Sequence, residues 1–129
     1  MIDKKILIVD DDKTIVELLK TLIEPIGCQI FIANDGAEAF SVYRREKPHL
    51  VILDIMMPKF TGYQVLHRMK KDESFKPFPK ILMLSAKSSP EDIRQAEMFK
   101  CDAYLTKPFE PEDLVNKVKE LLNLKNYTL

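Results

Sequence analysis

The alternation of short apolar runs with helix-length amphipathic segments is the feature that most constrains the fold. The runs are rich in Ile, Val and Leu, and they lie at 6–9, 30–33, 50–53, 81–84 and, more weakly, 103–105. Short, continuously apolar runs are typical of strands buried on both faces of a parallel sheet. Two of the intervening segments repeat apolar residues at helical spacing, at Ile15, Leu18, Leu19, Leu22 and Ile23, and at Leu114, Val118, Leu121 and Leu122.

Start and stop signals flank these predicted helices. Capping or first-turn residues are Asp11 or Asp12, Asn34 or Asp35, Ser89 with Pro90, and Pro111, while Gly27 suits a helix stop and Thr61-Gly62 a turn. Strict strand and helix alternation with short connections implies right-handed crossovers and a parallel sheet covered on both faces. The sequence therefore predicts a single doubly wound α/β domain over residues 1–129, with 73–79 as its most irregular connection.

Composition narrows the classes of partner. Lys plus Arg and Asp plus Glu each number 20, so a net charge of 0 supplies no general field for nucleic acid or anionic membranes. Cys28 and Cys101 belong to no metal or CxxC pattern and are expected to be reduced thiols. The N-terminal apolar run is too short for a signal peptide or a spanning helix. We expect a soluble, cytoplasmic protein without direct nucleic-acid or membrane contacts.

Polar side chains follow four of the apolar runs. Asp10 and Asp11 end the first run, Asp54 ends the third, Ser85 ends the fourth, and Lys107 lies just past the fifth. In an open parallel sheet, ligands bind outside the carboxyl ends of the strands, near the point where the strand order reverses. We expect these side chains to meet at that edge of the sheet.

The chemistry of such a set is specific. Neighbouring carboxylates raise one another's pKa unless a cation joins them, and Mg²⁺ prefers oxygen ligands. A lysine and a serine hydroxyl suit the oxygens of a phosphoryl group. Together these groups predict in-line attack on phosphorus by an aspartate, assisted by Mg²⁺.

The sequence resembles a bacterial response-regulator receiver domain over essentially its whole length. The matching segments, in order, are ILIVDDD, NDGAEAF, PHLVILDIMMP, TGYQVL, ILMLSA and DAYLTKPF. This resemblance implies a flavodoxin-like sheet of order 2-1-3-4-5. It also implies that Asp54 accepts a phosphoryl group from a phosphohistidine on a sensor histidine kinase or a histidine phosphotransfer protein, and later loses it by slow hydrolysis.

The resemblance further implies a role for each site residue. Asp11, Asp54 and the backbone carbonyl of Met56 would hold Mg²⁺, with Asp10 acting largely through water. Lys107 would be the ion-pair partner of the phosphoryl group, in a Lys107-Pro108 bond that is a candidate for the cis form.

The same resemblance implies a switch. Ser85 would move to a phosphoryl oxygen, and Tyr104 would change rotamer with it. The face of helix four, strand five and helix five would then be re-presented to a downstream protein partner or a missing output domain.

Several positions depart from the family pattern. Thr61 and Lys100-Cys101 replace common residues away from the chemistry, although Lys100 can reshape the end of the fourth helix. Met56 and Lys87 flank the expected path of the hydrolytic water, and an apolar Met56 side chain predicts slow self-dephosphorylation.

Another departure from the family pattern bears on the oligomeric state. One side of the dimer charge pattern of transcription factors is present at Asp113, Lys117 and Lys119, but the opposing positions are Ile93, Met98 and Ala103. The loss of the opposing charges favours a monomer and leaves an apolar strip for a partner.

Other functions fit the residues less well. A haloacid-dehalogenase-type phosphatase needs a second acid at the position of Met56, and a nucleotide-binding enzyme needs a glycine-rich loop where residues 10–13 stand. Two alternatives stay open. The chain can be a pseudo-receiver that binds protein without being phosphorylated, or the receiver part of a longer regulator or hybrid kinase.

Overall fold

A five-stranded parallel sheet forms the centre of the molecule. The computed structural model describes residues 2–57, 61–86 and 89–124. The strands are β1 (Lys5–Val9), β2 (Gln29–Ala33), β3 (Leu50–Asp54), β4 (Lys80–Ser85) and β5 (Ala103–Thr106). Their order is β2-β1-β3-β4-β5, and every neighbouring pair is parallel. The predicted doubly wound, flavodoxin-like fold is therefore confirmed.

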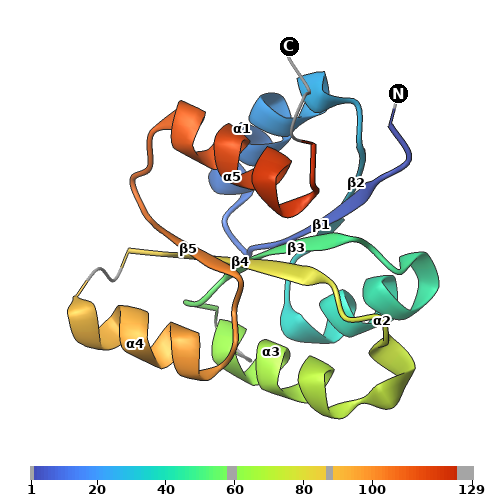
Figure 1. Cartoon of the computed structure of the whole chain (residues 1–129), viewed down its shortest axis with the longest axis vertical. Helices are drawn as coiled ribbons and strands as arrows, with labels where there is room; N and C mark the ends of the chain where they lie inside the picture. Colours follow the sequence, from blue (N-terminus) through green and yellow to red (C-terminus); the bar gives the residue numbers. More distant parts are fainter. Residues whose placement is uncertain (1, 58–60, 87–88, 125–129) are drawn as a thin grey trace.

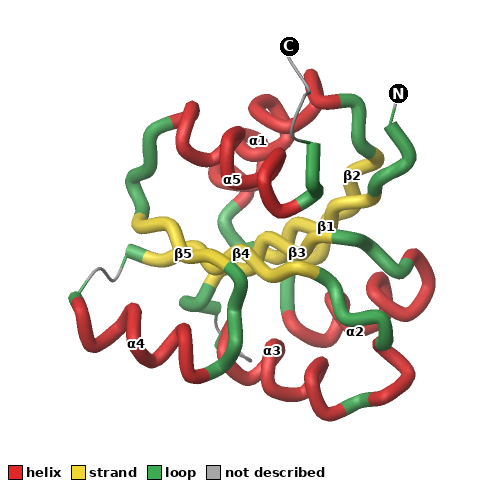
Figure 2. Tube along the Cα trace, in the orientation of Figure 1, coloured by secondary structure: helices red, strands yellow, loops and turns green. Residues whose placement is uncertain are grey.

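Helices cover both faces of the sheet. They are α1 (Lys13–Ile23), α2 (Gly36–Glu46), α3 (Gly62–Lys71), α4 (Pro90–Met98) and α5 (Pro111–Leu121), with 3₁₀ turns at Glu24–Ile26 and Glu73–Phe75. Figure 1 shows α1 and α5 on one face and α2, α3 and α4 on the other; Figure 2 shows the sheet between these two helical layers. Within the described ranges, no helix has the length and apolar character that a membrane crossing requires.

Two apolar cores lie on either side of the sheet, because side chains along each strand alternate between its faces. Ile6 and Ile8 of β1 belong to the core beneath α1 and α5, whereas Leu7 and Val9 belong to the core beneath α2 and α3. All five residues of β3 are buried. Since a fully buried aliphatic side chain contributes about 1.5 to 3 kcal/mol, the central strands anchor the domain.

The apolar stripe of α1 differs in two positions from the predicted one, because Val16 was not predicted to be buried and Leu18 was. Val16, Leu19 and Ile23 are the buried residues of the helix, whereas Leu18 is 42% exposed. Successive residues of an α-helix are separated by about 100°, so the neighbour of Leu19 points away from the centre of the stripe. Inclusion of Leu18 in the packing face was therefore wrong.

Most predicted helix signals are confirmed in detail. The Asp12 carboxylate caps α1 by accepting from the backbone N–H groups of Thr14 and Ile15. The three other side-chain caps are Asp35 for α2, Thr61 with Gln64 in a capping box for α3, and Ser89 for α4. These caps satisfy amide groups that helices leave unpaired at their N-termini.

The chain also takes left-handed turns at expected places. Gly27 follows the first 3₁₀ turn with φ of 90°. Lys100 takes φ of 62° after α4, where the sequence departs from a common glycine. The side chain makes this conformation less favourable than it is for glycine. Lys100 therefore takes the left-handed conformation although it carries a side chain.

The segment 73–79 is an irregular connection, as predicted, and it is tied to the core. It contains the 3₁₀ turn Glu73–Phe75 and a cis Lys76-Pro77 bond. The Tyr43 hydroxyl donates to the carbonyl oxygens of Phe75, at 3.0 Å, and Pro77, at 3.3 Å. Burial raises the pKa of Tyr43 to about 12. This segment precedes β4 at the amino edge of the sheet, opposite the edge where the acids gather.

Candidate functional site

Three aspartates from two neighbouring strands meet at the carboxyl edge of the sheet. Asp10 and Asp11 follow β1, and Asp54 is the last residue of β3. One carboxylate oxygen from each lies within 4.8 Å of the others. Asp10 is 1% exposed and Asp54 5% exposed, while Asp11 is open to solvent. The predicted convergence of the three acids is confirmed.

Lys107 brings one positive charge to these acids. Its Nζ lies 3.2 Å from Asp10 Oδ2 and 3.3 Å from Asp54 Oδ1. The Lys107 backbone N–H donates to the Ser85 carbonyl oxygen at 2.7 Å, and the Lys107-Pro108 bond is cis, as predicted. The lysine is thus held between two buried carboxylates by its own backbone as well as by charge.

Backbone amides orient the buried carboxylates. The Asp12 N–H donates to Asp10 Oδ1 at 2.9 Å, and the Met56 N–H donates to Asp54 Oδ1 at 3.2 Å. The Met56 side chain is 55% exposed beside the site. The Met56 bond holds the Asp54 carboxylate in a fixed orientation. Asp54 lies at the end of its strand, at the edge where ligands bind in such sheets.

The charges within the site are not balanced. Burial and, after it, the negative charge of Asp10 together raise the pKa of Asp54 to about 6, and Lys107 only partly offsets them. Burial disfavours the charged form of Lys107, but the carboxylates of Asp54 and Asp10 outweigh this effect and raise its pKa. Among the described residues, Lys107 is the cation paired with this cluster of three acids. A further positive charge at this point would stabilise the ionised carboxylates.

Ser85 and Tyr104 lie on neighbouring strands beside the acids. Ser85 ends β4 and is fully buried. Tyr104 belongs to β5, which pairs with β4 so that Ser85 faces Thr106. Burial raises the pKa of Tyr104, and a hydrogen bond with the Ser85 side chain lowers it in part. The two predicted switch residues are therefore in direct contact.

The aromatic environment of Tyr104 reaches α3 and α4. The charge of Tyr104 is one of the influences that raise the pKa of Tyr63, after burial. Tyr63 donates to the Asp92 carbonyl oxygen of α4 at 3.4 Å and stacks on Phe99 with centroids 4.9 Å apart. Tyr63 thus contacts α4 directly, and Tyr104 lies near enough to influence it electrostatically.

Gly62 has a positional role that the sequence reasoning missed. A Cβ at this first residue of α3 would lie 2.5 Å from the Asp54 carbonyl oxygen and 2.9 Å from the Ile55 Cα. The Gly62 N–H donates to the Ile55 carbonyl oxygen at 2.9 Å. Only a residue without a side chain lets α3 begin this close to the strand that carries Asp54. The motif TG suggested a turn, but no sequence signal specified this contact.

Two expectations fall partly or wholly beyond the described ranges. Lys87, expected beside the hydrolytic water, lies outside the described residues. The matching segment PHLVILDIMMP ends at Pro58, which also lies outside the described residues.

A flavodoxin-like domain with an acidic cluster and a lysine at its switch point defines a narrow class of protein. The family model of the response regulator receiver domain matches residues 6–119. The chain belongs to this family, whose members act in two-component signalling.

Individual relatives agree with this assignment. The protein PilG of Pseudomonas aeruginosa is 36% identical over 115 residues, which cover 89% of this chain and 84% of PilG. A probable transcriptional regulator, ycf27 of Porphyridium aerugineum, is 40% identical over 119 residues, or 92% of this chain and 48% of ycf27. The chain spans about half the length of such transcriptional regulators.

A solved structure shows the same architecture. The chemotaxis protein CheY4 of Vibrio cholerae superposes with a TM-score of 0.84 at 28% identity, over 93% of this chain and 99% of that one. This superposition supports the same flavodoxin-like fold.

Proposed function

We propose that this chain is a working phosphoacceptor switch in which Asp54 receives a phosphoryl group from a phosphohistidine donor. The observation that carries the proposal is the ion-pair geometry, in which Lys107 bridges the buried Asp10 and Asp54 carboxylates at 3.2 and 3.3 Å. A structural salt bridge has little need of a third acid within 4.8 Å. A phosphoryl group, in contrast, needs cations on several sides. An excess of acids can hold a metal ion that supplies one of these cations.

The donor set fits Mg²⁺. In the proposed site Asp11, Asp54 and the Met56 carbonyl hold the ion, and Asp10 acts largely through water. Carboxylate and carbonyl oxygens are the ligands that Mg²⁺ prefers. The bound ion would neutralise phosphoryl oxygens during transfer.

The residues of the chain perform the remaining steps. An Asp54 carboxylate oxygen attacks phosphorus, forming an O–P bond as the P–N bond to the donor imidazole breaks and its electron pair leaves with nitrogen. Lys107 pairs with a phosphoryl oxygen in place of one of its carboxylate partners, so its positive charge remains paired. Water later cleaves the acyl phosphate, which returns Asp54 and inorganic phosphate.

The switch rests on Ser85. Its buried hydroxyl is hydrogen bonded to Tyr104 and would transfer this bond to a phosphoryl oxygen. The released Tyr104 would change rotamer, and its electrostatic influence on Tyr63, which donates to the Asp92 carbonyl oxygen of α4, would change with it. The face of α4, β5 and α5 then differs between the two states.

We propose partners of two kinds. A sensor histidine kinase or a histidine phosphotransfer protein supplies the phosphoryl group, and a downstream protein or an output domain reads the face of α4, β5 and α5. Met98 on α4 is 81% exposed, but it borders a hollow shared with His67 and Lys70 of α3 rather than β5 or α5. Residues 1–129 form a single receiver domain in this proposal, acting as a monomer and serving as a phosphoacceptor rather than as a conventional turnover enzyme.

Intact mass measurement tests the proposal directly. The chain is incubated with acetyl phosphate and Mg²⁺, beside Asp54→Asn and a sample with EDTA in place of Mg²⁺. A single phosphoryl adduct is expected for the native chain alone. Absence of the adduct, while Mg²⁺ still binds, would replace this proposal with the pseudo-receiver function.

A further inference from the structure

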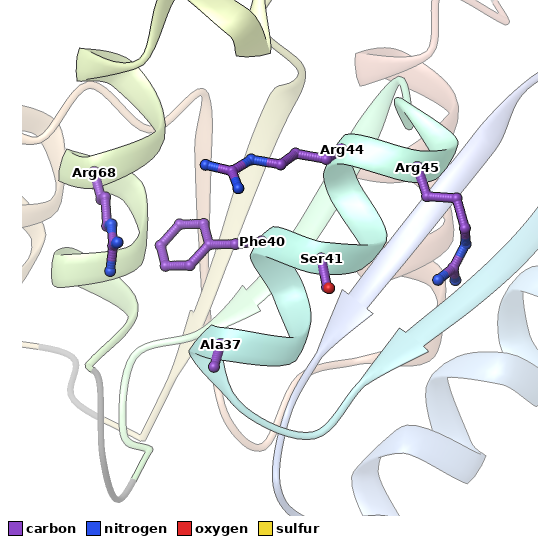
Figure 3. A pocket seen from close by; sticks show the side chains of 6 residues that line it. All are labelled: Ala37, Phe40, Ser41, Arg44, Arg45 and Arg68. Carbon is purple, nitrogen blue, oxygen red and sulfur yellow. The ribbon is translucent and has the colours of Figure 1, made fainter.

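A basic groove runs along the outer surface of α2, away from the acidic site. It encloses about 520 Å³ and is lined by Ala37, Phe40, Ser41, Arg44, Arg45 and Arg68. Figure 3 shows that Arg44 and Phe40 extend from α2 toward Arg68 of α3, whereas Arg45 points to the other side of the helix. Guanidinium groups therefore flank both sides of a floor that carries only small side chains, Ala37 and Ser41.

The floor of the groove follows from helical spacing. Ala37 and Ser41 are exposed and four residues apart, so they lie one turn above another on the same face. Phe40 is 8% exposed and its ring supports Arg68, whose Cζ lies 4.8 Å from the ring centroid. The stacked guanidinium is held in place while its N–H groups stay available for other partners.

The two other arginines are joined to acids that have further partners. Arg44 Nη2 lies 3.4 Å from Asp72 Oδ2, but Asp72 Oδ1 already accepts from the N–H and hydroxyl of Ser74. Arg45 Nε lies 3.0 Å from Glu46, which also pairs with Lys5 at 3.5 Å. The side chains of Arg44 and Arg45 are 63% and 64% exposed. Exposed pairs of this kind contribute little, so both arginines can turn to another anion without stranding an acid.

Arg68 completes the positive charge of the groove. Across the ranges that the structure describes, no carboxylate lies within 4.0 Å of its guanidinium. Lys70 and Lys71, in the same last turn of α3, line a separate hollow beside α4 and are not part of the groove. In a chain of net charge 0, the arginines of the groove are a local concentration of positive charge.

We propose that the α2 groove docks an acidic segment of a partner protein. Carboxylates of that segment pair with Arg45 on one side and with Arg44 and Arg68 on the other, and a small or apolar side chain rests on Ala37 and Ser41. Arginine suits this role because its planar group binds a carboxylate through two parallel hydrogen bonds.

The distribution of charge favours a protein over other polyanions. Glu46 and Asp72 stand beside the arginines, so the potential along the groove alternates in sign. Spaced carboxylates fit such a pattern, whereas the continuous phosphates of a duplex or of an anionic bilayer meet repulsion at each acid. The groove lies on α2 and α3, so its occupancy is independent of the proposed chemistry at Asp54.

Nuclear magnetic resonance with a defined probe tests the docking site. The ¹⁵N-labelled chain is titrated with a short peptide that contains several Glu residues around one Leu, and with the same peptide carrying Gln for every Glu. Shifts are expected at Ala37 and Ser41 with the Glu peptide only. Arg45→Gln with Arg68→Gln removes two charge-assisted hydrogen bonds and should weaken binding by more than about tenfold, since the loss of one such bond alone costs about tenfold.

Matched variants separate this site from general charge attraction. Arg94→Gln with Lys117→Gln removes two exposed cations from α4 and α5 and should leave peptide affinity unchanged, as should Asp54→Asn. Circular dichroism checks that each variant is folded. Equal binding of the Gln peptide, or equal weakening by the α4 and α5 variant, overturns the proposal. Tighter binding of a DNA duplex or of phosphatidylglycerol vesicles through the same arginines also overturns it.

Discussion

Replacement of Asp54 by Asn should make the metal-free chain more stable. The Asp54 pKa rises from 3.8 to about 6 because burial and Asp10 disfavour its charge. This difference is about two pKa units, and each unit corresponds to about 1.4 kcal/mol, so ionising Asp54 in the folded chain costs about 2 to 3 kcal/mol. Asn keeps the size of the side chain and an oxygen that can accept from the Met56 N–H.

The sign of the effect follows from proton binding. The folded chain holds the Asp54 proton more tightly than the unfolded chain, so this proton stabilises the fold fully below about pH 4. The stabilisation is lost as the pH rises through about 6, where Asp54 ionises in the folded chain as well. The advantage of Asp54→Asn should therefore be near zero at about pH 4 and reach its full size above about pH 6.

Urea unfolding followed by circular dichroism in EDTA measures this prediction. Asp3→Asn, at an exposed position near the N-terminus, is the matched control and should leave stability unchanged. Added Mg²⁺ should narrow the difference, because a ligand that binds the folded native chain raises its stability. A less stable Asp54→Asn variant near neutral pH, or a gain of equal size at about pH 4, would refute the electrostatic reasoning.

Three further perturbations test other parts of the site. Lys107→Met should destabilise the chain by about 3 kcal/mol in urea unfolding, because it leaves two buried carboxylates without their cation. The same substitution should cost less in a chain that already carries Asp54→Asn. Gly62→Ala should cost about 1 to 3 kcal/mol because its methyl group meets the Asp54 backbone; an unchanged urea midpoint would contradict this contact. Met56→Glu should speed loss of the phosphoryl adduct about tenfold in timed mass spectra by orienting water, whereas the control Met98→Glu, exposed on α4, should not.

The parts of the fold that depend on local sequence could be predicted. The strand at Leu50–Asp54 is continuously apolar because it is buried on both faces, and that composition is visible in the sequence. Helix caps such as Asp12 and Asp35 act within three residues of their own position. The meeting of Asp54 with Lys107 followed from a general rule about the carboxyl ends of parallel strands.

The parts that depend on tertiary placement could not be predicted in the same way. Exposure of Leu18 reflects the angle at which α1 packs, and the close approach of Gly62 to Asp54 reflects where α3 begins. The groove between Arg45 and Arg68 combines side chains from two helices separated by a strand. Each of these features depends on how neighbouring elements pack together, and the spacing of residues within one element does not predict it.

The partner of the buried Ser85 hydroxyl bears directly on how the proposed switch can be bistable. A buried hydroxyl without a hydrogen bond is costly, so a serine that only waited for phosphate would destabilise the resting domain. Here Tyr104 supplies the bond before phosphorylation, and a phosphoryl oxygen would supply it afterwards. Both states keep Ser85 satisfied, so the equilibrium depends on the difference between two hydrogen bonds rather than on the whole strength of one. A single phosphoryl group can reverse a free-energy difference of that size between the two states.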